Sequence, residues 1–252
     1  MVFLMYHELE SKGRPLCQNA PGYLRYVVPE TNFRAQMNSL NSQGWRGADV
    51  DHALLFDSST VAITFDDGSE TDLLIAAPVL REFGFGATFY VTTGFLGRPG
   101  YLTVAQLQGL ASMGFQIGCH SMTHAYLSDL DDEGLRREIV DSKMQLEQIV
   151  GKRVEHFSCP GGRYNVRSVQ IVKTAGYRTM STSHCVANFA GTDVFALGRI
   201  PVMRETTLRT FDARSHGHGL WSLRIRESFQ QLGKRMLGNT VYDRLRDAVL
   251  NK

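Results

Sequence analysis

The order of apolar segments along the chain limits its fold more than any other feature. From about residue 61, short apolar runs alternate with longer segments whose apolar residues recur at helical spacing. The short runs, which predict buried strands, are residues 61–65, 87–92, 115–119, 154–158 and 177–181. The helical segments between them are residues 71–83, 103–114, 131–150 and 166–175. This alternation is typical of βα units that form a largely parallel sheet.

Similar signals occur nearer the N-terminus, where residues 2–6 predict a strand and residues 32–42 a helix. The count then reaches six or seven strands, which favours an α/β barrel or near-barrel over a small open sheet. Signals at helix ends support these boundaries. Thr103 and Gln106 form a possible capping box, and Gly151 stands where a helix would end.

Composition places the chain among ordinary globular proteins, with 252 residues of which 43% are hydrophobic and 21% charged. We expect one domain, because single α/β barrels often reach this length. The formal net charge of +2 is too small to indicate a nucleic-acid partner. The four cysteines are widely spaced and form no CxxC pair, so neither a zinc knuckle nor a disulfide framework is indicated.

The C-terminal residues differ in character from the rest of the chain. From Ser222 onward there are seven Lys or Arg residues against three Asp or Glu residues, and an apolar stripe runs from Ile225 to Met236. We predict a barrel domain at residues 1–220 and a basic amphipathic helical extension at 221–252 that packs on it. Weak contact between the basic face and a membrane surface is the alternative.

No apolar stretch approaches 18 residues, so no transmembrane segment is expected. The opening run at residues 2–6 is too short for a secretory signal and lacks a basic region before it. On these grounds we expect a cytoplasmic protein, or an extracytoplasmic one if a leader has been removed.

Polar residues that can bind a metal follow several predicted strands directly. His7 follows residues 2–6, and His120 follows residues 115–119. Asp66 and Asp67 follow the strand at 61–65 in the same way. Active sites of barrel enzymes lie at the carboxyl ends of the strands. We therefore expect these side chains to lie close together.

The pair Asp66 and Asp67 precedes Gly68, which permits a sharp turn. Adjacent residues of a strand face opposite ways, so a bend is needed to bring both carboxylates into one site. Two close carboxylates repel each other unless a cation lies between them. With a bound metal, one Asp could be a ligand and the other a general base. Taken alone, Asp-Asp-Gly is also compatible with a plain turn.

His120 and His124 are four residues apart and would share one face if the segment were helical. Two imidazoles and one carboxylate give three protein ligands, the open arrangement of catalytic rather than structural zinc sites. The ligand types also suit cobalt, nickel and iron.

The segments 64–68 (TFDDG) and 120–124 (HSMTH) resemble the first two motifs of the polysaccharide deacetylases, which form carbohydrate esterase family four. The resemblance extends over about residues 1 to 205 and implies a distorted (β/α)7 barrel. It also implies that a metal-activated water removes N-acetyl groups from an amino-sugar glycan of the N-acetylglucosamine type. By this resemblance the catalytic base is Asp66, and the divalent metal, zinc in the first place, is bound by Asp67, His120 and His124.

Two later motifs of the family are altered here. Ser158 stands where the family has an Arg that braces the base, and Arg163 or Arg199 could replace it. Residues 160–165 predict a groove wall with Tyr164 against a sugar face, although a plain turn fits them equally. The residues expected to contact substrate are Pro160, Gly161, Gly162, Arg163, Tyr164 and Arg199.

The Leu-x-His motif that supplies the general acid in the family is absent from residues 196–202. In this respect the chain resembles the branch that deacetylates poly-N-acetylglucosamine, where a Tyr-His pair after the first strand supplies the acid. Tyr6 and His7 match that pair, so we predict His7 as the acid, with His184 as a weaker candidate. Two alternatives remain: a hydrolase of a small amide or cyclic imide, and a catalytically inactive barrel that binds glycan.

Overall fold

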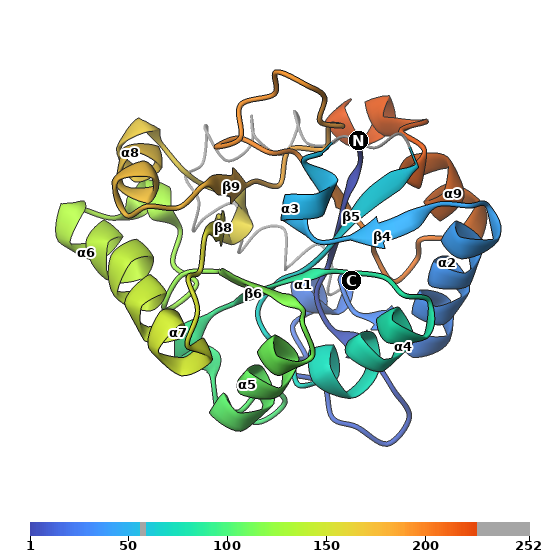
Figure 1. Cartoon of the computed structure of the whole chain (residues 1–252), viewed down its shortest axis with the longest axis horizontal. Coiled ribbons are helices and arrows are strands. Elements are labelled where there is room, and N and C mark those ends of the chain that lie inside the picture. Colours follow the sequence, from blue (N-terminus) through green and yellow to red (C-terminus); the bar gives the residue numbers. More distant parts are fainter. Residues whose placement is uncertain (56–58, 226–252) are drawn as a thin grey trace.

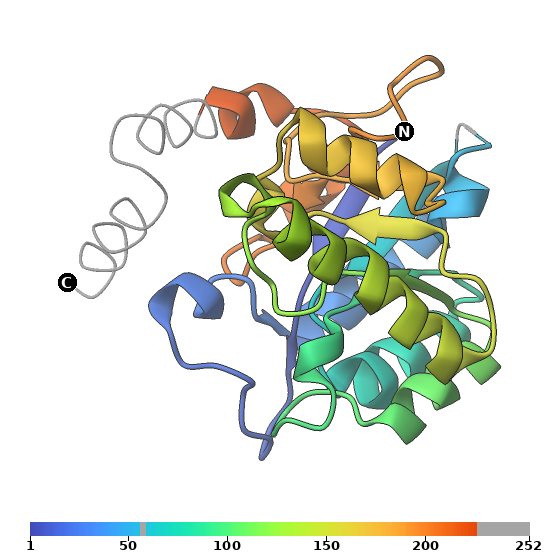
Figure 2. The same cartoon turned by 90° about the vertical axis from the view of Figure 1, so that its left-hand side faces the viewer.

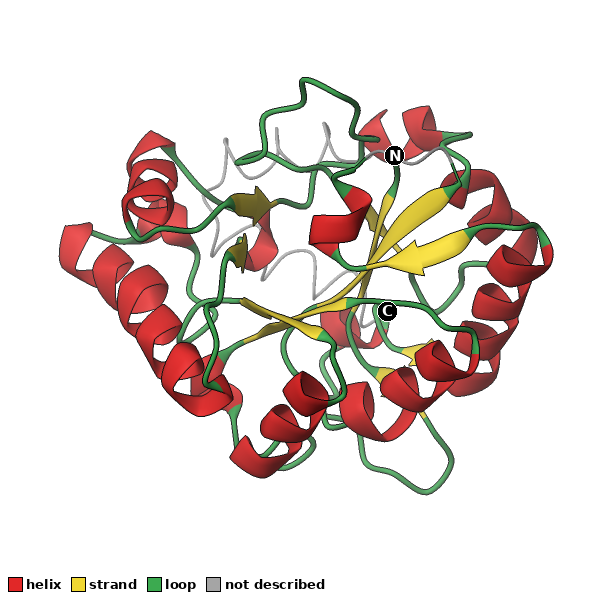
Figure 3. Ribbon diagram, viewed as in Figure 1, coloured by secondary structure: helices red, strands yellow, loops and turns green. Residues whose placement is uncertain are grey.

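The structure is a computed structural model that describes residues 1–55 and 59–225. Strands lie at its centre and helices surround them (Figure 3). The strands of the main sheet are all parallel, and their bounds are β1 (Phe3–Tyr6), β4 (Arg46–Ala48), β5 (Thr60–Phe65), β6 (Thr88–Val91), β7 (Gln116–Cys119), β8 (His156–Ser158), β9 (Thr179–Ser181) and β10 (Ile200–Pro201). They follow the order β10-β1-β5-β6-β7-β8-β9, while β4 pairs with the first half of β5. A second, two-stranded sheet pairs β2 (Leu9–Glu10) with β3 (Val28–Pro29).

One short segment links the two edges of the main sheet. Leu197 forms a parallel bridge with Ser181 at the end of β9, and Ile200 of β10 pairs with Leu4 of β1. The sheet therefore curves into a parallel half-barrel with helices around it, which confirms the predicted α/β barrel-type fold. Arg199 lies in this linking segment, between Leu197, which bridges to β9, and Ile200, which pairs with β1.

The helices follow one another around the sheet from α9 and α2 through α4 and α5 to α7, α6 and α8 (Figure 1). Their bounds are α1 (Pro21–Leu24), α2 (Glu30–Ser42), α3 (Val50–Ala53), α4 (Ala77–Glu82), α5 (Val104–Ser112), α6 (Asp132–Arg136), α7 (Ser142–Val150), α8 (Val166–Thr174) and α9 (Leu208–Ser215). Three single 3₁₀ turns, η2 (Thr93–Phe95), η3 (Leu127–Asp129) and η5 (Pro160–Gly162), follow β6, β7 and β8.

Two of the predicted helices are interrupted by π-helical turns. The first contains η1 (Asp72–Ala76) before α4, and Pro78 in the first turn of α4 cannot donate the hydrogen bond that a continuous helix needs. The second contains η4 (Arg137–Asp141) between α6 and α7. There the Ser142 hydroxyl donates to the Glu138 carbonyl at 2.6 Å.

The core explains why the short runs form strands. Every residue of β5 is buried, as expected for a parallel strand covered on both faces. The Phe65 ring stacks between Tyr6, at 5.2 Å between ring centroids, and Phe89, at 5.0 Å. The predicted capping box of Thr103 and Gln106 is present, and Gly151 ends α7 at φ 67°.

Sequence patterns did not predict β4 or β10. Arg46 is exposed and Gly47 has no side chain, so β4 lacks an apolar run, and β10 is only two residues long with Pro201 as its second. Most of the basic helical extension predicted at residues 221–252 lies outside the described residues, and so does its predicted membrane contact. Within the described residues, no helix is long and apolar enough to cross a membrane.

Gly118 of β7 tests the packing of this barrel. A Cβ atom there would overlap the Tyr90 ring and lie 3.2 Å from the His156 carbonyl oxygen. Tyr90 cannot move away easily, because it is fully buried and its hydroxyl lies 2.9 Å from the Ser181 hydroxyl. We expect Gly118→Ala to lower the free energy of unfolding by about 1–3 kcal/mol, measured by urea denaturation.

The control for this prediction is Gly109→Ala in α5, where the nearest side-chain atoms would lie at 3.7 Å and 3.8 Å from the new Cβ. That substitution improves helix propensity and should raise stability by up to about 1 kcal/mol. Equal effects of the two substitutions would contradict the packing described for Gly118.

Candidate active site

Asp66 and Asp67 leave the carboxyl end of β5 and are both buried. The backbone of Asp67 is left-handed, with φ 78°, and Gly68 follows at φ 82°. This bend brings two adjacent carboxylates to the same end of the barrel, as the sequence required. A left-handed conformation costs a residue with a side chain about 1–2 kcal/mol. Among the described residues other than glycine, positive φ occurs at Asp67, Ser121 and His124, and such strain is concentrated at functional sites.

The spacing of His120 and His124 would place both on one face of a helix, but the segment that carries them is not helical. They flank a turn in which Ser121 has φ 68° and His124 has φ 65°. The Ser121 hydroxyl accepts a hydrogen bond from the His124 backbone N–H at 3.0 Å. The two imidazole centroids are 5.0 Å apart. The turn thus brings the two imidazoles together, as a helix would, but at the cost of a strained backbone.

Asp67, His120 and His124 form a group whose ligand atoms all lie within 4.8 Å of one another. Asp67 Oδ1 is 3.5 Å from Nε2 of His120 and 3.5 Å from Nε2 of His124. This oxygen is buried and has no hydrogen-bond partner among the described residues. A buried carboxylate oxygen is costly to leave unsatisfied, so the donor set fits a divalent cation of the zinc type.

The protonation of His120 agrees with that fit. Its Nδ1 lies 2.8 Å from the Ser158 carbonyl oxygen, so Nδ1 carries the proton and donates it, and the lone pair of Nε2 faces Asp67. Burial lowers the pKa of His120 to about 4, which keeps the ring neutral near pH 7. A neutral imidazole fixed through its other nitrogen is the form that binds metals.

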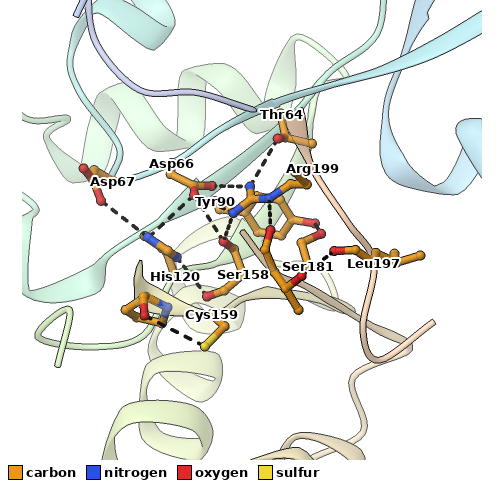
Figure 4. A network of polar contacts seen from close by, with 12 residues as sticks. Thr64, Asp66, Asp67, Tyr90, His120, Ser158, Cys159, Ser181, Leu197 and Arg199 are labelled. Atoms are coloured by element: carbon orange, nitrogen blue, oxygen red, sulfur yellow. Dashed lines mark hydrogen bonds and ion pairs between the residues drawn. The ribbon is translucent and has the colours of Figure 1, made fainter. Parts of the chain in front are cut away.

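Asp66 has a different environment, because it is paired with Arg199 (Figure 4). Arg199 is fully buried, and its two terminal nitrogens donate to the two oxygens of Asp66 at 2.7 Å each. Burial would raise the pKa of Asp66, but the charge of Arg199, with a smaller contribution from His120, outweighs it. The pKa of Asp66 therefore lies well below its usual range, and the carboxylate is ionised at neutral pH.

The remaining donors of Arg199 are also occupied. Nε donates to the Thr182 carbonyl at 3.0 Å, and the terminal nitrogens also donate to Thr64 Oγ1 at 3.2 Å and Ser158 Oγ at 2.8 Å. A guanidinium has five N–H donors, so none is left for a substrate. Of the two candidates to replace the Arg of the third motif, Arg199 is the one that braces Asp66. The expectation that Arg199 also contacts substrate is at odds with this geometry.

Arg163, the other candidate, lies over the Tyr126 ring, with 3.8 Å between its guanidinium carbon and the ring centroid. The turn before it uses two left-handed glycines, Gly161 at φ 59° and Gly162 at φ 64°. A Cβ at Gly162 would lie 2.9 Å from the side chain of Ser183, so this turn has no space for one. Pro160 and Arg163 are buried, whereas Gly161 is exposed.

Tyr164 is half-buried, and its hydroxyl lies 3.1 Å from Nε2 of His184. His184 is therefore engaged with Tyr164 beside the predicted groove wall.

His7 lies at the end of β1, and its ring packs against Tyr26 with centroids 4.7 Å apart. Its Nδ1 atom is buried and has no hydrogen-bond partner among the described residues. Burial lowers the pKa of His7, although the nearby charges of Asp67 and Asp66 oppose this shift. His7 therefore lies close enough to both carboxylates for their charges to affect its pKa, as its position after the first strand predicts.

Glu8 and Glu138 are two of the buried carboxylates that were not singled out from the sequence. Glu8, next to His7, accepts hydrogen bonds from the Cys17 backbone N–H at 3.1 Å and from the Tyr23 hydroxyl at 2.9 Å. It ties down the segment that carries α1, which runs along one side of the barrel (blue in Figure 2). Glu138 is the second. It follows the apolar Leu135 by three residues, so on a helix both share one face, and this spacing was the available signal that Glu138 is buried.

The fold and the site define an α/β barrel with an Asp-His-His cluster beside a braced carboxylate. Residues 56–180 match the sequence model of the polysaccharide deacetylases. The chain therefore contains a domain of the polysaccharide deacetylase family.

Three similar proteins illustrate this relationship. YxkH of Bacillus subtilis (strain 168) is 29% identical over 209 residues, which cover 80% of this chain and 71% of that protein. The peptidoglycan-N-acetylglucosamine deacetylase of Bacillus cereus is 36% identical over 121 residues, 48% of this chain and 54% of that protein. The structure of the Streptococcus pyogenes deacetylase PplD superposes with a TM-score of 0.74 at 21% identity, over 83% of this chain and 95% of that one, and shows the shared fold.

The buried ion pair gives a testable prediction. Arg199→Met leaves Asp66 buried without a cation, so the free energy of unfolding of the metal-free protein should fall by about 3–5 kcal/mol at pH 7. In the wild type the lowered pKa of Asp66 contributes stability above pH about 4, the unfolded value. In the variant the pKa of Asp66 is raised instead, so the difference in stability should shrink as the pH falls from 7 towards 4.

Chemical denaturation at several pH values checks this prediction, with the double variant Asp66→Asn, Arg199→Met as control. The double variant should recover part of the lost stability, because no unpaired charge remains. A difference between wild type and Arg199→Met that stays the same from pH 7 to pH 4 would contradict the pairing.

Proposed function

We propose that this protein removes N-acetyl groups from an amino-sugar glycan of the N-acetylglucosamine type, with a divalent ion, zinc in the first place, bound by Asp67, His120 and His124. The observation that carries the proposal is the contrast between two adjacent carboxylates. Asp66 is braced by Arg199, whereas Asp67 Oδ1 has no partner beside the two histidines. Membership of the family supports the reaction, and the name of the Bacillus cereus relative supports the sugar.

A divalent ion bound there would polarise the acetamide carbonyl and lower the pKa of a water molecule. In the mechanism we infer, Asp66 accepts the proton of the attacking water, since it is ionised and Arg199 fixes its orientation. His7 in its protonated form donates a proton to the leaving amine. Loss of acetate then leaves a free amino group on the sugar.

Half-buried aromatic rings on the loops after four strands favour a glycan over a small cyclic imide. Tyr26 lies after β2 and α1, and Phe95, Tyr126 and Tyr164 lie after β6, β7 and β8. Aromatic rings with one accessible part combine apolar contact with hydrogen bonding, which suits the mixed surface of a sugar. Rings on several loops provide contacts for more than one sugar unit.

Asp66→Asn tests the catalytic base. The amide cannot accept the proton of the attacking water, so acetate release from N-acetylglucosamine oligomers should fall by about 10²–10⁴-fold. Metal affinity should stay near that of the wild type, because Asp66 is not a member of the ligand set. Acetate release is measured enzymatically with metal-reconstituted protein, and metal affinity by titration. Substantial turnover by Asp66→Asn would remove Asp66 from this role.

His7→Ala tests the acid in the same assay. We expect a reduction of about 10²-fold or more at neutral pH, with unchanged metal affinity. Turnover equal to that of the wild type would keep the reaction and discard His7.

Wild-type protein that releases no acetate from any oligomer would direct attention to the two other functions. Hydrolysis of small amides or cyclic imides would then identify a different hydrolase, and glycan binding without turnover would identify an inactive barrel.

A further inference from the structure

Glu138 lies directly behind the turn that carries the two histidines. Its carboxylate is buried, and it accepts hydrogen bonds from the backbone N–H groups of Met122 at 2.9 Å and Thr123 at 2.8 Å. It also accepts a bond from the Thr123 hydroxyl at 2.6 Å. One carboxylate therefore satisfies three donors within the segment between His120 and His124.

The π-helical turn brings Glu138 to this position. Glu138 is the second residue of η4, and the helical path otherwise continues from α6 into α7. A π turn inserts one residue, which rotates the following side chains by about 100° relative to a continuous α-helix. π-helical turns of this kind occur frequently at functional sites. The break in this helix thus coincides with the carboxylate that faces the histidine turn.

The opposite side of the turn is held by backbone groups after β6. The N–H of Thr93 donates to the Ser121 carbonyl at 3.2 Å, and the N–H of Gly94 donates to the Met122 carbonyl at 2.8 Å. A Cβ at Gly94 would lie 2.5 Å from the Met122 oxygen, so this approach depends on glycine. The turn is clamped between η2 on one side and the Glu138 side chain on the other.

This clamp acts where the backbone is strained. Ser121 and His124 flank Met122 and Thr123, and both are left-handed. If the two N–H groups lost their acceptor, the turn would relax towards conformations in which His120 and His124 no longer converge on Asp67. We propose that Glu138 is a positioning residue that holds the turn in its metal-binding conformation. This inference rests on the proposed metal role of Asp67, His120 and His124.

The experiment compares metal affinity with stability. Glu138→Ala, Glu138→Gln and the wild type are titrated with Zn²⁺ against a chromophoric chelator, and the thermal unfolding of each metal-free protein is followed. We expect Glu138→Ala to weaken metal affinity by about 10–100-fold, the usual effect of losing a group that orients ligands. Glu138→Gln keeps a carbonyl oxygen that can accept the backbone N–H groups, so it should restore most of the affinity.

Glu147→Ala is the matched control on the same helical segment. Glu147 accepts bonds from the Val154 backbone N–H at 2.9 Å and from Lys143 at 2.8 Å, and neither donor belongs to the histidine turn. Glu147→Ala should lower the unfolding temperature without changing metal affinity. The Co²⁺ absorption spectrum adds a direct view of ligand geometry and should change in Glu138→Ala only.

The outcomes separate the two proposals. If the wild type binds no metal, the proposed function fails. If the wild type binds metal and Glu138→Ala binds it equally well, with an unchanged Co²⁺ spectrum, the positioning role fails. An equal loss of affinity in Glu147→Ala would also overturn it, because the effect would then follow stability alone. Should Glu138→Ala not fold, Glu138→Gln and Thr123→Val, which removes the hydroxyl bond, carry the comparison with expected losses of a few-fold each.

Discussion

The buried pair of Asp66 and Arg199 is the interaction on which the rest of the site depends. It joins the end of β5, a central strand, to the segment that links the two edges of the sheet. Burying two charges is costly unless every donor and acceptor is satisfied, and here the guanidinium has acceptors for all of its N–H groups. The same contacts that satisfy Arg199 therefore fix where the barrel closes and how Asp66 is oriented.

The residues with strained backbone and the groups that hold the strained segment lie in different parts of the molecule. The strained residues are Asp67, Ser121 and His124, all within the two motifs. The groups that hold the segment from His120 to His124 belong to neighbouring elements: the Glu138 carboxylate, the backbone of η2, and the Ser158 carbonyl that fixes His120. A rigid barrel can support such strain because its core is formed by buried parallel strands. This division explains why the motif residues alone do not define the site.

The sequence predicted most of the fold and the three residues that the structure brings together in the Asp-His-His cluster, but not the groups that support them. Buried strands such as β5 and helices with explicit caps, such as α5, follow from local patterns. The strand β10 could not be found in this way, because two residues carry no periodicity and its pairing with β1 depends on contacts distant in the chain. The bracing by Arg199 was one of two options, and the choice required knowing which residue lies inside the barrel. Glu138 was missed because a carboxylate within a helical segment is normally solvent-exposed.

The sequence alone does not decide which of the two adjacent carboxylates would bind a metal and which would accept a proton. The two side chains have different surroundings in the structure. Titratable groups with opposed environments can be assigned opposed roles. Both oxygens of Asp66 accept bonds from Arg199, so a cation at that carboxylate would compete with a guanidinium that is already in place. Asp67 has an oxygen without a partner that faces two imidazole nitrogens. These contacts support the proposed roles of Asp67 as ligand and Asp66 as base without recourse to the motif resemblance.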